Sequence, residues 1–217
     1  MSTELEFAAK AADVVGLYLT PPENALVLSL DEKPKIQLER RSGYVVSSAR
    51  RLVQGYESTY TRHGRLNLFA ALEVAPGRIH AQTTLSFEKT KVGFLSFLES
   101  VLAGFPGSDT VEYHVILDTP RIHKRHENWL AAHRNVFFHY TPPRASWLNL
   151  VAVWFGILRL KSLRGASFTD TGQLATPIKA FQNASNEPAR PFLLSGGSGK
   201  SEGRNSQIQP RTFATRH

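Results

Sequence analysis

The stretch ALVLSLDE, from Ala25 to Glu32, decides how this chain folds. A short apolar run that ends at charged residues is typical of a buried β-strand. Glu112–Leu117 has the same form, because the sequence EYHVIL ends at Asp118. In open α/β folds, side chains just past the carboxyl ends of neighbouring strands build the functional site. The two runs therefore predict a sheet with Asp31 and Asp118 at one edge.

The remaining apolar patterns predict further strands and helices. Leu66–Val74 and Arg78–Leu85 are expected to form a hairpin, because Ala75-Pro76-Gly77 separates two β-compatible runs. Another strand is expected at Val136–Tyr140. Helical spacing of apolar residues predicts three helices, at Phe87–Ala103, Arg121–His133 and Ser146–Leu163. The last of them is expected to begin with a serine cap. Strands that alternate with helices after a hairpin indicate an α/β protein, a mixed sheet with helices on its faces.

The pattern predicts one folded domain between two less regular ends. Residues 1–24 are expected to be a linker-like N-terminal segment, and residues 25–192 the folded domain. Residues 193–217 are expected to be a disordered basic tail, because Gly, Ser, Gln and Arg dominate it without apolar periodicity. The start has no secretory pattern, and no uncharged apolar run reaches the roughly 18 residues of a membrane span. We therefore expect a cytoplasmic protein that does not contact a membrane.

Positive charge is concentrated in the middle of the chain. The net charge is +8, and within residues 119–165 Glu127 is the only acid among eight basic residues: Arg121, Lys124, Arg125, Arg134, Arg144, Arg159, Lys161 and Arg164. Such a stretch suits binding of a polyanionic partner. A basic surface that only keeps the protein soluble would explain the same number of basic residues. The chain has no cysteine, which excludes disulfides and zinc–thiolate sites.

Several short motifs follow one another around these acids. They are DEKPKIQ from Asp31, RHG from Arg62, Asp118-Thr119 with His123-Lys124 after it, SWLN from Ser146 with Trp154-Phe155 after it, and Arg164-Gly165 with Asn186 further on. In order and in spacing they resemble the motifs of mariner-like insertion-sequence transposases, over roughly residues 5–192. No single motif is decisive, but the series as a whole is specific.

The resemblance implies a ribonuclease-H-like fold and a DDE-type catalytic domain that cleaves and joins DNA phosphodiester bonds in transposition, a form of DNA recombination. In such enzymes three carboxylates hold two Mg²⁺ or Mn²⁺ ions around the scissile phosphate. Asp31 and Asp118 would be the first and second catalytic, metal-binding acids. Glu32 is a poor substitute, because neighbouring side chains of an extended segment point to opposite faces. DNA is the expected partner, a second copy of the chain is another candidate, and no small-molecule cofactor is implied.

The chain departs from the family at the third acid. That acid falls three residues past the Asn of SWLN, where this chain has Ala152, and no carboxylate lies between Glu127 and Asp170. Because a methyl group cannot coordinate a metal, we expect weakened metal binding and impaired catalysis. Two alternatives stay open: an active transposase in which another acid, with Asp170 the nearest, replaces the ligand, and a non-catalytic nucleic-acid-binding remnant. The series of motifs argues against a binding domain with no enzymatic ancestry.

Other conspicuous side chains carry weaker expectations. The expected DNA-binding residues are Arg62, His63, His123, Lys124, Arg125, Arg144, Asn149, Arg159 and Lys161. Either a transition-metal site or surface positions beside a phosphate-binding face would explain the grouped histidines His123, His126, His133 and His139. The aromatic residues Trp147, Trp154 and Phe155 could stack on DNA bases. Their helical spacing favours packing in the core instead.

Overall fold

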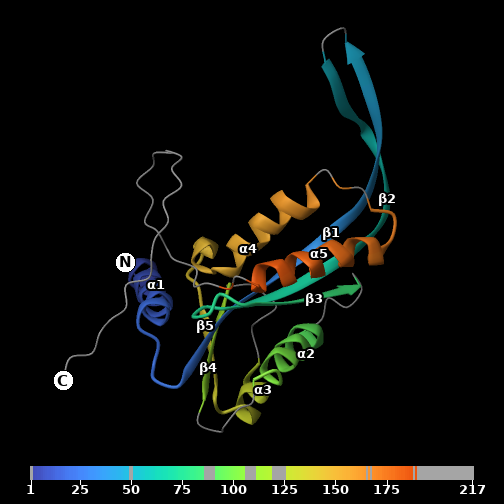
Figure 1. The fold of residues 1–217 in the computed structure, drawn as a ribbon. Coiled ribbons are helices and arrows are strands. Elements are labelled where there is room, and N and C mark those ends of the chain that lie inside the picture. Colours follow the sequence, from blue (N-terminus) through green and yellow to red (C-terminus); the bar gives the residue numbers. More distant parts are fainter. Residues whose placement is uncertain are drawn as a thin grey trace, which may run out of the picture.

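The computed structural model describes residues 2–48, 51–85, 91–105, 111–118, 126–164, 166, 168–187 and 189. In this part of the chain five strands form one mixed sheet in the order β3-β2-β1-β4-β5 (Figure 1). Two antiparallel pairs join β1 (Ala25–Ser48) to β2 (Arg51–Glu73) and β2 to β3 (Ile79–Leu85). Two parallel pairs join β1 to β4 (Glu112–Leu117) and β4 to β5 (Val136–Tyr140).

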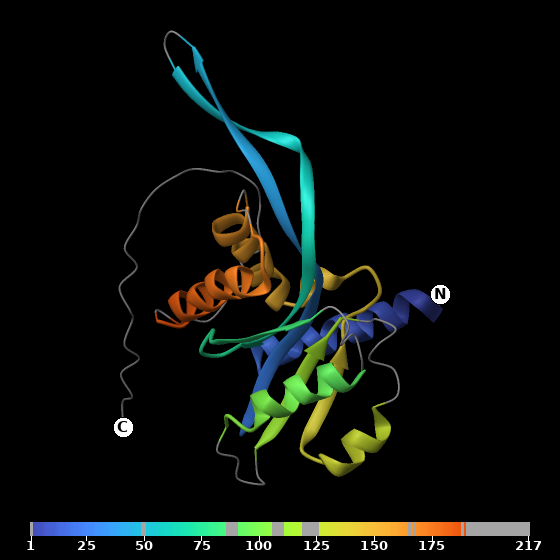
Figure 2. The ribbon, with the colours of Figure 1, turned by 90° about the vertical axis from the view of Figure 1, so that its right-hand side faces the viewer.

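Helices cover both faces of the sheet, as the sequence predicted. One face carries α1 (Ser2–Leu19), α4 (Val151–Leu158) and α5 (Thr171–Asn186), and the other carries α2 (Lys91–Leu102) and α3 (Glu127–Ala132) (Figures 1 and 2). Strand alternation divides the core accordingly. On β2, Leu68 and Ala70 pack with α4 and α5, whereas Phe69 and Ala71 pack with α2.

The strand predictions around the site are confirmed. The structure gives β4 and β5 the predicted bounds, and β2 and β3 form the predicted hairpin around a turn in which Gly77 has a φ of 73°. The predicted helices are confirmed over α2 and α3, but residues 86–90 and 121–125 lie outside the described residues. None of the described helices combines the length and the apolar character that a membrane span requires.

The expectation of a linker-like segment at residues 1–24 is wrong for residues 2–19, which form α1. Val14 and Leu17 are buried against the sheet in a cluster that includes Val27, Ile116 and Leu148. The Tyr18 hydroxyl donates a hydrogen bond of 2.7 Å to the Leu148 carbonyl. The apolar residues of α1 pack only because the sheet supplies a surface for them, so α1 belongs to the folded domain.

Beyond the sheet, β1 and β2 continue together as a protruding two-stranded ribbon (Figures 1 and 2). Their pairing runs to Ser48 opposite Arg51, with register shifts between Lys33 and Ile36, Gln37 and Glu39, and Arg41 and Gly43. Such shifts let a ribbon twist and bend away from a sheet. The sequence predicted no element here, and Asp31 therefore lies within a continuing strand and not after its end.

The predicted helix at Ser146–Leu163 is three elements. A 3-10 turn covers Ser146–Leu148, α4 follows at Val151–Leu158, and a π-helical stretch covers Arg159–Leu163. This break changes which aromatic residues are buried, because Asn149 between the two helices is extended. Core packing is confirmed for Trp154, which is 2% exposed, and for Phe155, but it is wrong for Trp147, which is 66% exposed.

The contrast between two tryptophans gives a matched stability test. Trp154→Ala should lower the free energy of unfolding by about 3–5 kcal/mol, because it empties a volume in the core beneath α4. Trp147→Ala should change it by less than about 0.5 kcal/mol, since that ring is exposed. Urea unfolding followed by circular dichroism measures both values. Equal losses in the two variants would contradict the described packing.

Candidate active site

Asp31 and Asp118 lie side by side on neighbouring strands. The parallel pairing of β1 with β4 ends at Leu30 opposite Leu117, so the two aspartates occupy the next level of the sheet. Ser29 faces α4, because its hydroxyl accepts a hydrogen bond of 2.9 Å from the backbone N–H of Val151. Asp31 is two residues further along the strand and therefore faces the same way. On β4, Ile116 packs in the α1 cluster on this face, and Asp118 again follows two residues later.

Burial and mutual repulsion set the electrostatics of this pair. Burial raises the pKa of Asp31 from its ordinary value of 3.8 to about 6, and the neighbouring carboxylates of Asp118 and Glu32 also act to raise it. The Glu32 backbone N–H, which donates to Asp31 Oδ1 at 2.7 Å, acts in the opposite direction. Asp118 accepts a hydrogen bond of 3.0 Å from the Thr141 hydroxyl at the end of β5. Two partly buried acids therefore share one edge of the sheet.

A buried group of hydrogen bonds ties α4 to β1 just below the acids. The Asn149 side chain is fully buried, donates from Nδ2 to the Leu30 carbonyl at 3.0 Å and accepts from the Ser29 hydroxyl. The Ser29 hydroxyl in turn accepts the Val151 N–H, so a distant strand caps α4 and the predicted local serine cap does not form. We remove Asn149 from the predicted DNA contacts, because it is buried and both ends of its amide already bond to β1.

The first turn of α4, which contains Ala152, is bonded to the strand that carries Asp31. Val151 bonds to Ser29, and the Phe155 ring centroid is 5.9 Å from Lys33 Nζ. In the sequence of α4, Ala152 lies between Val151 and Phe155. In β1, Asp31 lies between their partners, Ser29 and Lys33. The third carboxylate is expected at Ala152, and the methyl group there offers no oxygen.

Asp170 does not replace that carboxylate. It is exposed and caps α5, where its Oδ1 accepts a hydrogen bond of 2.9 Å from the Gln173 N–H. Across the described ranges, no group of three His, Cys, Asp or Glu side chains is arranged to hold a metal ion. Two adjacent carboxylates suit one hard divalent cation, but they supply too few oxygen atoms for a pair of such ions.

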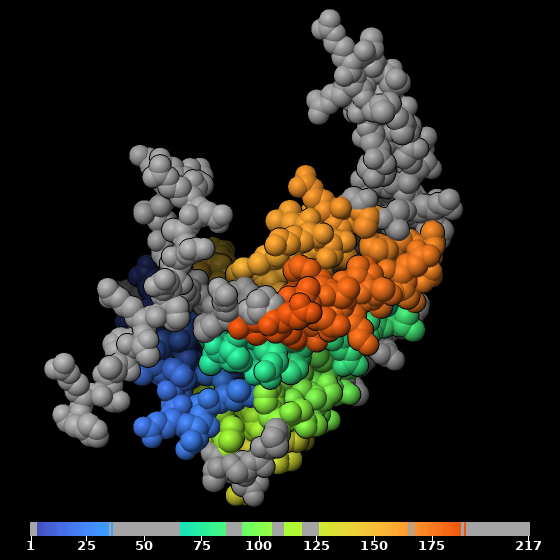
Figure 3. Space-filling view, in the orientation of Figure 1, coloured from blue at the N-terminus to red at the C-terminus, as the bar shows by residue number. Residues whose placement is uncertain are grey.

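The structure separates the other predicted DNA-binding residues. Arg159 and Lys161 are exposed and lie in the π-helical stretch that follows α4. Figure 3 shows α4 and α5, in orange, on the face of the molecule turned to the viewer. Arg62 and His63 lie on β2, and nothing is described of their side chains. Three more predicted residues lie outside the described residues: His123, Lys124 and Arg125.

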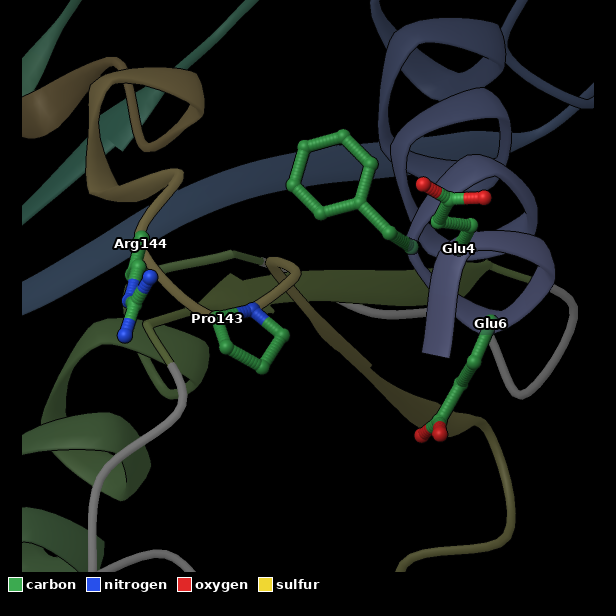
Figure 4. A pocket seen from close by; sticks show the side chains of 5 residues that line it. Glu4, Glu6, Pro143 and Arg144 are labelled. Atoms are coloured by element: carbon green, nitrogen blue, oxygen red, sulfur yellow. The ribbon is translucent and has the colours of Figure 1, made fainter. Parts of the chain in front are cut away.

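Arg144 lies at a pocket and not with the other basic residues. The pocket has a volume of about 580 Å³ between α1 and the turn after β5. Figure 4 shows Pro143 and Arg144 on one wall and Glu4 and Glu6 on the other. Arg144 is exposed and has a φ of 66°, so the turn holds it in the left-handed region. Its acidic surroundings suit a phosphate less well than those of Arg159.

The histidines of the group that the structure describes, His126, His133 and His139, have different partners and do not converge on one site. His126 is buried, with its ring 5.5 Å from that of Phe94 and 6.0 Å from that of Phe138, so the expected surface position is wrong for it. His133 Nδ1 donates to the Trp129 carbonyl at 2.8 Å. His139 Nδ1 lies 2.8 Å from Asp13 of α1, and His123 lies outside the described residues.

Ser29, Thr141 and Lys33 lie around the acids and were not predicted as site residues. One signal was present: Ser29 is a polar residue inside an apolar strand, and a buried hydroxyl needs a partner. Thr141 and Lys33 gave no such signal, because their neighbours Asp118 and Phe155 are distant in the sequence.

The comparisons with known structures identify the fold. The solved structure of a Mos1 transposase paired-end complex with left transposon end matches with a TM-score of 0.55 at 10% identity, over 86% of this chain and 56% of that chain. A simian T-cell lymphotropic virus intasome in complex with PP2A regulatory subunit B56 gamma has a TM-score of 0.45 at 13% identity, over 82% of this chain and 59% of that chain. The first likeness confirms the predicted ribonuclease-H-like α/β fold.

The family follows from the sequence comparison. Residues 27–175 match the family described as DDE superfamily endonuclease, which is more than half of the chain. The chain belongs to this family, as its motifs predicted. No curated protein sequence matches it. The chain spans little more than half the length of the Mos1 transposase chain that it resembles.

The raised pKa of Asp31 predicts how stability depends on pH. Between about pH 4 and pH 6 the folded protein binds a proton at Asp31 more tightly than the unfolded chain does, so stability falls as pH rises through this range. Asp31→Asn removes this effect. The variant should be more stable than the unmodified chain at pH 8, by on the order of 1–3 kcal/mol, and the difference should vanish below about pH 4.

Urea unfolding at intervals from pH 3.5 to pH 8 measures this difference. Glu23→Gln is the matched control, because it removes an exposed carboxylate before β1. A stability difference between Asp31→Asn and the unmodified chain that does not change with pH would contradict the assignment.

Proposed function

We propose that this chain is a DNA-binding DDE domain, derived from an insertion-sequence transposase, whose cleavage of phosphodiester bonds is impaired. The observation that carries the proposal is the hydrogen bond from the Val151 N–H to Ser29, because it brings the first turn of α4, which contains Ala152, beside the strand that carries Asp31. Residues 25–192 would form the catalytic-type unit, to which the structure adds α1. Cytoplasmic location and self-association into a dimer are parts of the same proposal.

Asp31 and Asp118 would hold one Mg²⁺ or Mn²⁺ ion. Bound there, the ion would neutralise charge on a phosphate group. Thr141 holds Asp118 through its hydroxyl, and the Glu32 N–H holds Asp31, so both carboxylates are oriented before any cation arrives. The buried position of Asp31 also means that a cation competes with a proton below about pH 6. A second ion would lack a carboxylate on the α4 side, which supports impaired catalysis.

DNA is the proposed partner because basic side chains lie just beyond the C-terminal end of α4. Arg159, Lys161 and Arg164 are exposed beyond the end of the helix whose first turn lies beside Asp31. A duplex that follows this line would meet cations that neutralise phosphates and release counterions. The Mos1 transposase structure is a complex with a transposon end, and we propose the same class of partner for this chain.

The second candidate function is nucleic-acid binding without any catalysis. The position of Asp170 favours it over a fully active enzyme, because that acid caps α5 and is not available as the missing ligand. The two candidates differ in one measurable quantity, the residual cleavage of DNA in the presence of a divalent cation.

Restoring the acid tests the proposal. Ala152→Glu should raise nicking of supercoiled DNA in Mg²⁺ or Mn²⁺ by at least about 10-fold over the unmodified chain, because it supplies a metal-binding oxygen. Ala152→Gln introduces a side chain with nearly the volume of Glu but without its charge, so it should raise nicking little. Adding Asp31→Ala to Ala152→Glu should remove the gain.

The unmodified chain decides between the two candidates. Slow nicking that Asp31→Ala abolishes favours the impaired enzyme, and no nicking above background favours binding alone. Nicking by the unmodified chain that equals that of Ala152→Glu would refute the proposed role of position 152.

A further inference from the structure

Lys33 lies on the same side of β1 as the two groups already described. Ser29 is fixed to the Val151 N–H, and Lys33 Nζ lies 5.9 Å from the centroid of the Phe155 ring, so both ends of this short segment face α4. Asp31 lies between them in the alternating pattern of the strand. The ammonium group therefore borders the site two residues beyond Asp31 along β1.

The charge of Lys33 has no carboxylate partner in the described part of the chain. Its one contact there is with the face of Phe155, and no described acid lies within 4.0 Å of its nitrogen. An aromatic face orients an ammonium group without using its N–H donors. The side chain is partly buried, so its stem is held while its donors stay available.

The alanine at position 152 explains why this cation lacks a partner. Ala152 precedes Phe155 by three residues, which places the two on neighbouring positions of the same helical face. A carboxylate at 152 would lie close to the ammonium group that covers Phe155. With a methyl group there, α4 supplies no carboxylate to pair with this cation. The nearby ammonium also acts against the rise in the pKa of Asp31, which shows that the two charges interact.

We propose that Lys33 binds a phosphate of the DNA backbone at the edge of the site, on the side where the third carboxylate is missing. A phosphodiester carries one negative charge and oxygen acceptors, and an ammonium group binds it through charge-assisted hydrogen bonds. Phe155 positions the ammonium group, and Asp31 keeps it at the edge. The inference rests on the proposed function, since it requires that DNA reaches this edge of the sheet.

The test measures the affinity of the whole chain for a fluorescent DNA duplex between about 50 and 200 mM KCl, without divalent cations. Lys33→Met keeps the length of the side chain and removes the charge. It should weaken binding by about 3- to 10-fold and reduce the slope of log affinity against log salt by about 0.9, the contribution of one phosphate contact. Lys33→Arg should keep the slope of the unmodified chain. Lys179→Met, an exposed lysine on α5, should also leave it unchanged.

The outcomes separate this inference from the proposed function. If the unmodified chain does not bind DNA at the lowest salt concentration, the proposed function itself fails. If it binds and Lys33→Met keeps its slope, only the role of Lys33 is wrong. An unchanged slope together with tighter Mn²⁺ binding by Lys33→Met would make Lys33 a counter-ion of Asp31, and would also overturn the inference. Lys33→Gln repeats the test if the methionine variant does not fold, as judged by its thermal transition.

Discussion

The hydrogen bonds among Ser29, Asn149 and Val151 are the constraint on which the site depends. They join the central strand to the start of α4, and residues 29 and 149 are 120 positions apart in the sequence. Because these groups are buried, each donor left without a partner would cost on the order of 1–3 kcal/mol, so the helix and the strand hold one relative position. Asp31 on β1 and Ala152 on α4 are placed by that one arrangement.

The chemistry of the site follows from which charges this arrangement brings together. Asp31 and Asp118 repel one another at the sheet edge, and burial makes the negative form of Asp31 costly. In the family that the chain belongs to, the motifs imply a third acid that would bind cations more tightly. Here the α4 side presents a methyl group and the ammonium group of Lys33 over Phe155.

Sequence patterns succeeded where a residue's environment follows from its neighbours along the chain. β4 and β5 have their predicted bounds, and Trp154 and Phe155 are buried, because alternation and helical spacing record which side of an element is apolar. The patterns failed for α1, whose apolar residues need the sheet as a surface. They also failed for Trp147, because the extended residue Asn149 interrupts the helix and resets its periodicity. His126 is buried by aromatic rings from α2 and β5, which no local pattern shows.

The sequence by itself determined the family, the two acids that follow the apolar runs of β1 and β4, and the alanine at position 152. These are properties of residue type and order. The local hydrophobic pattern is enough to place the two acids directly after the last paired residues of β1 and β4. Only the tertiary structure decided that α4 begins beside the strand of Asp31, that the Asn149 side chain is buried and bonded to β1, and that Lys33 lies over Phe155. Those facts depend on contacts between β1 and α4, and the packing of distant segments leaves no periodic signal in either one.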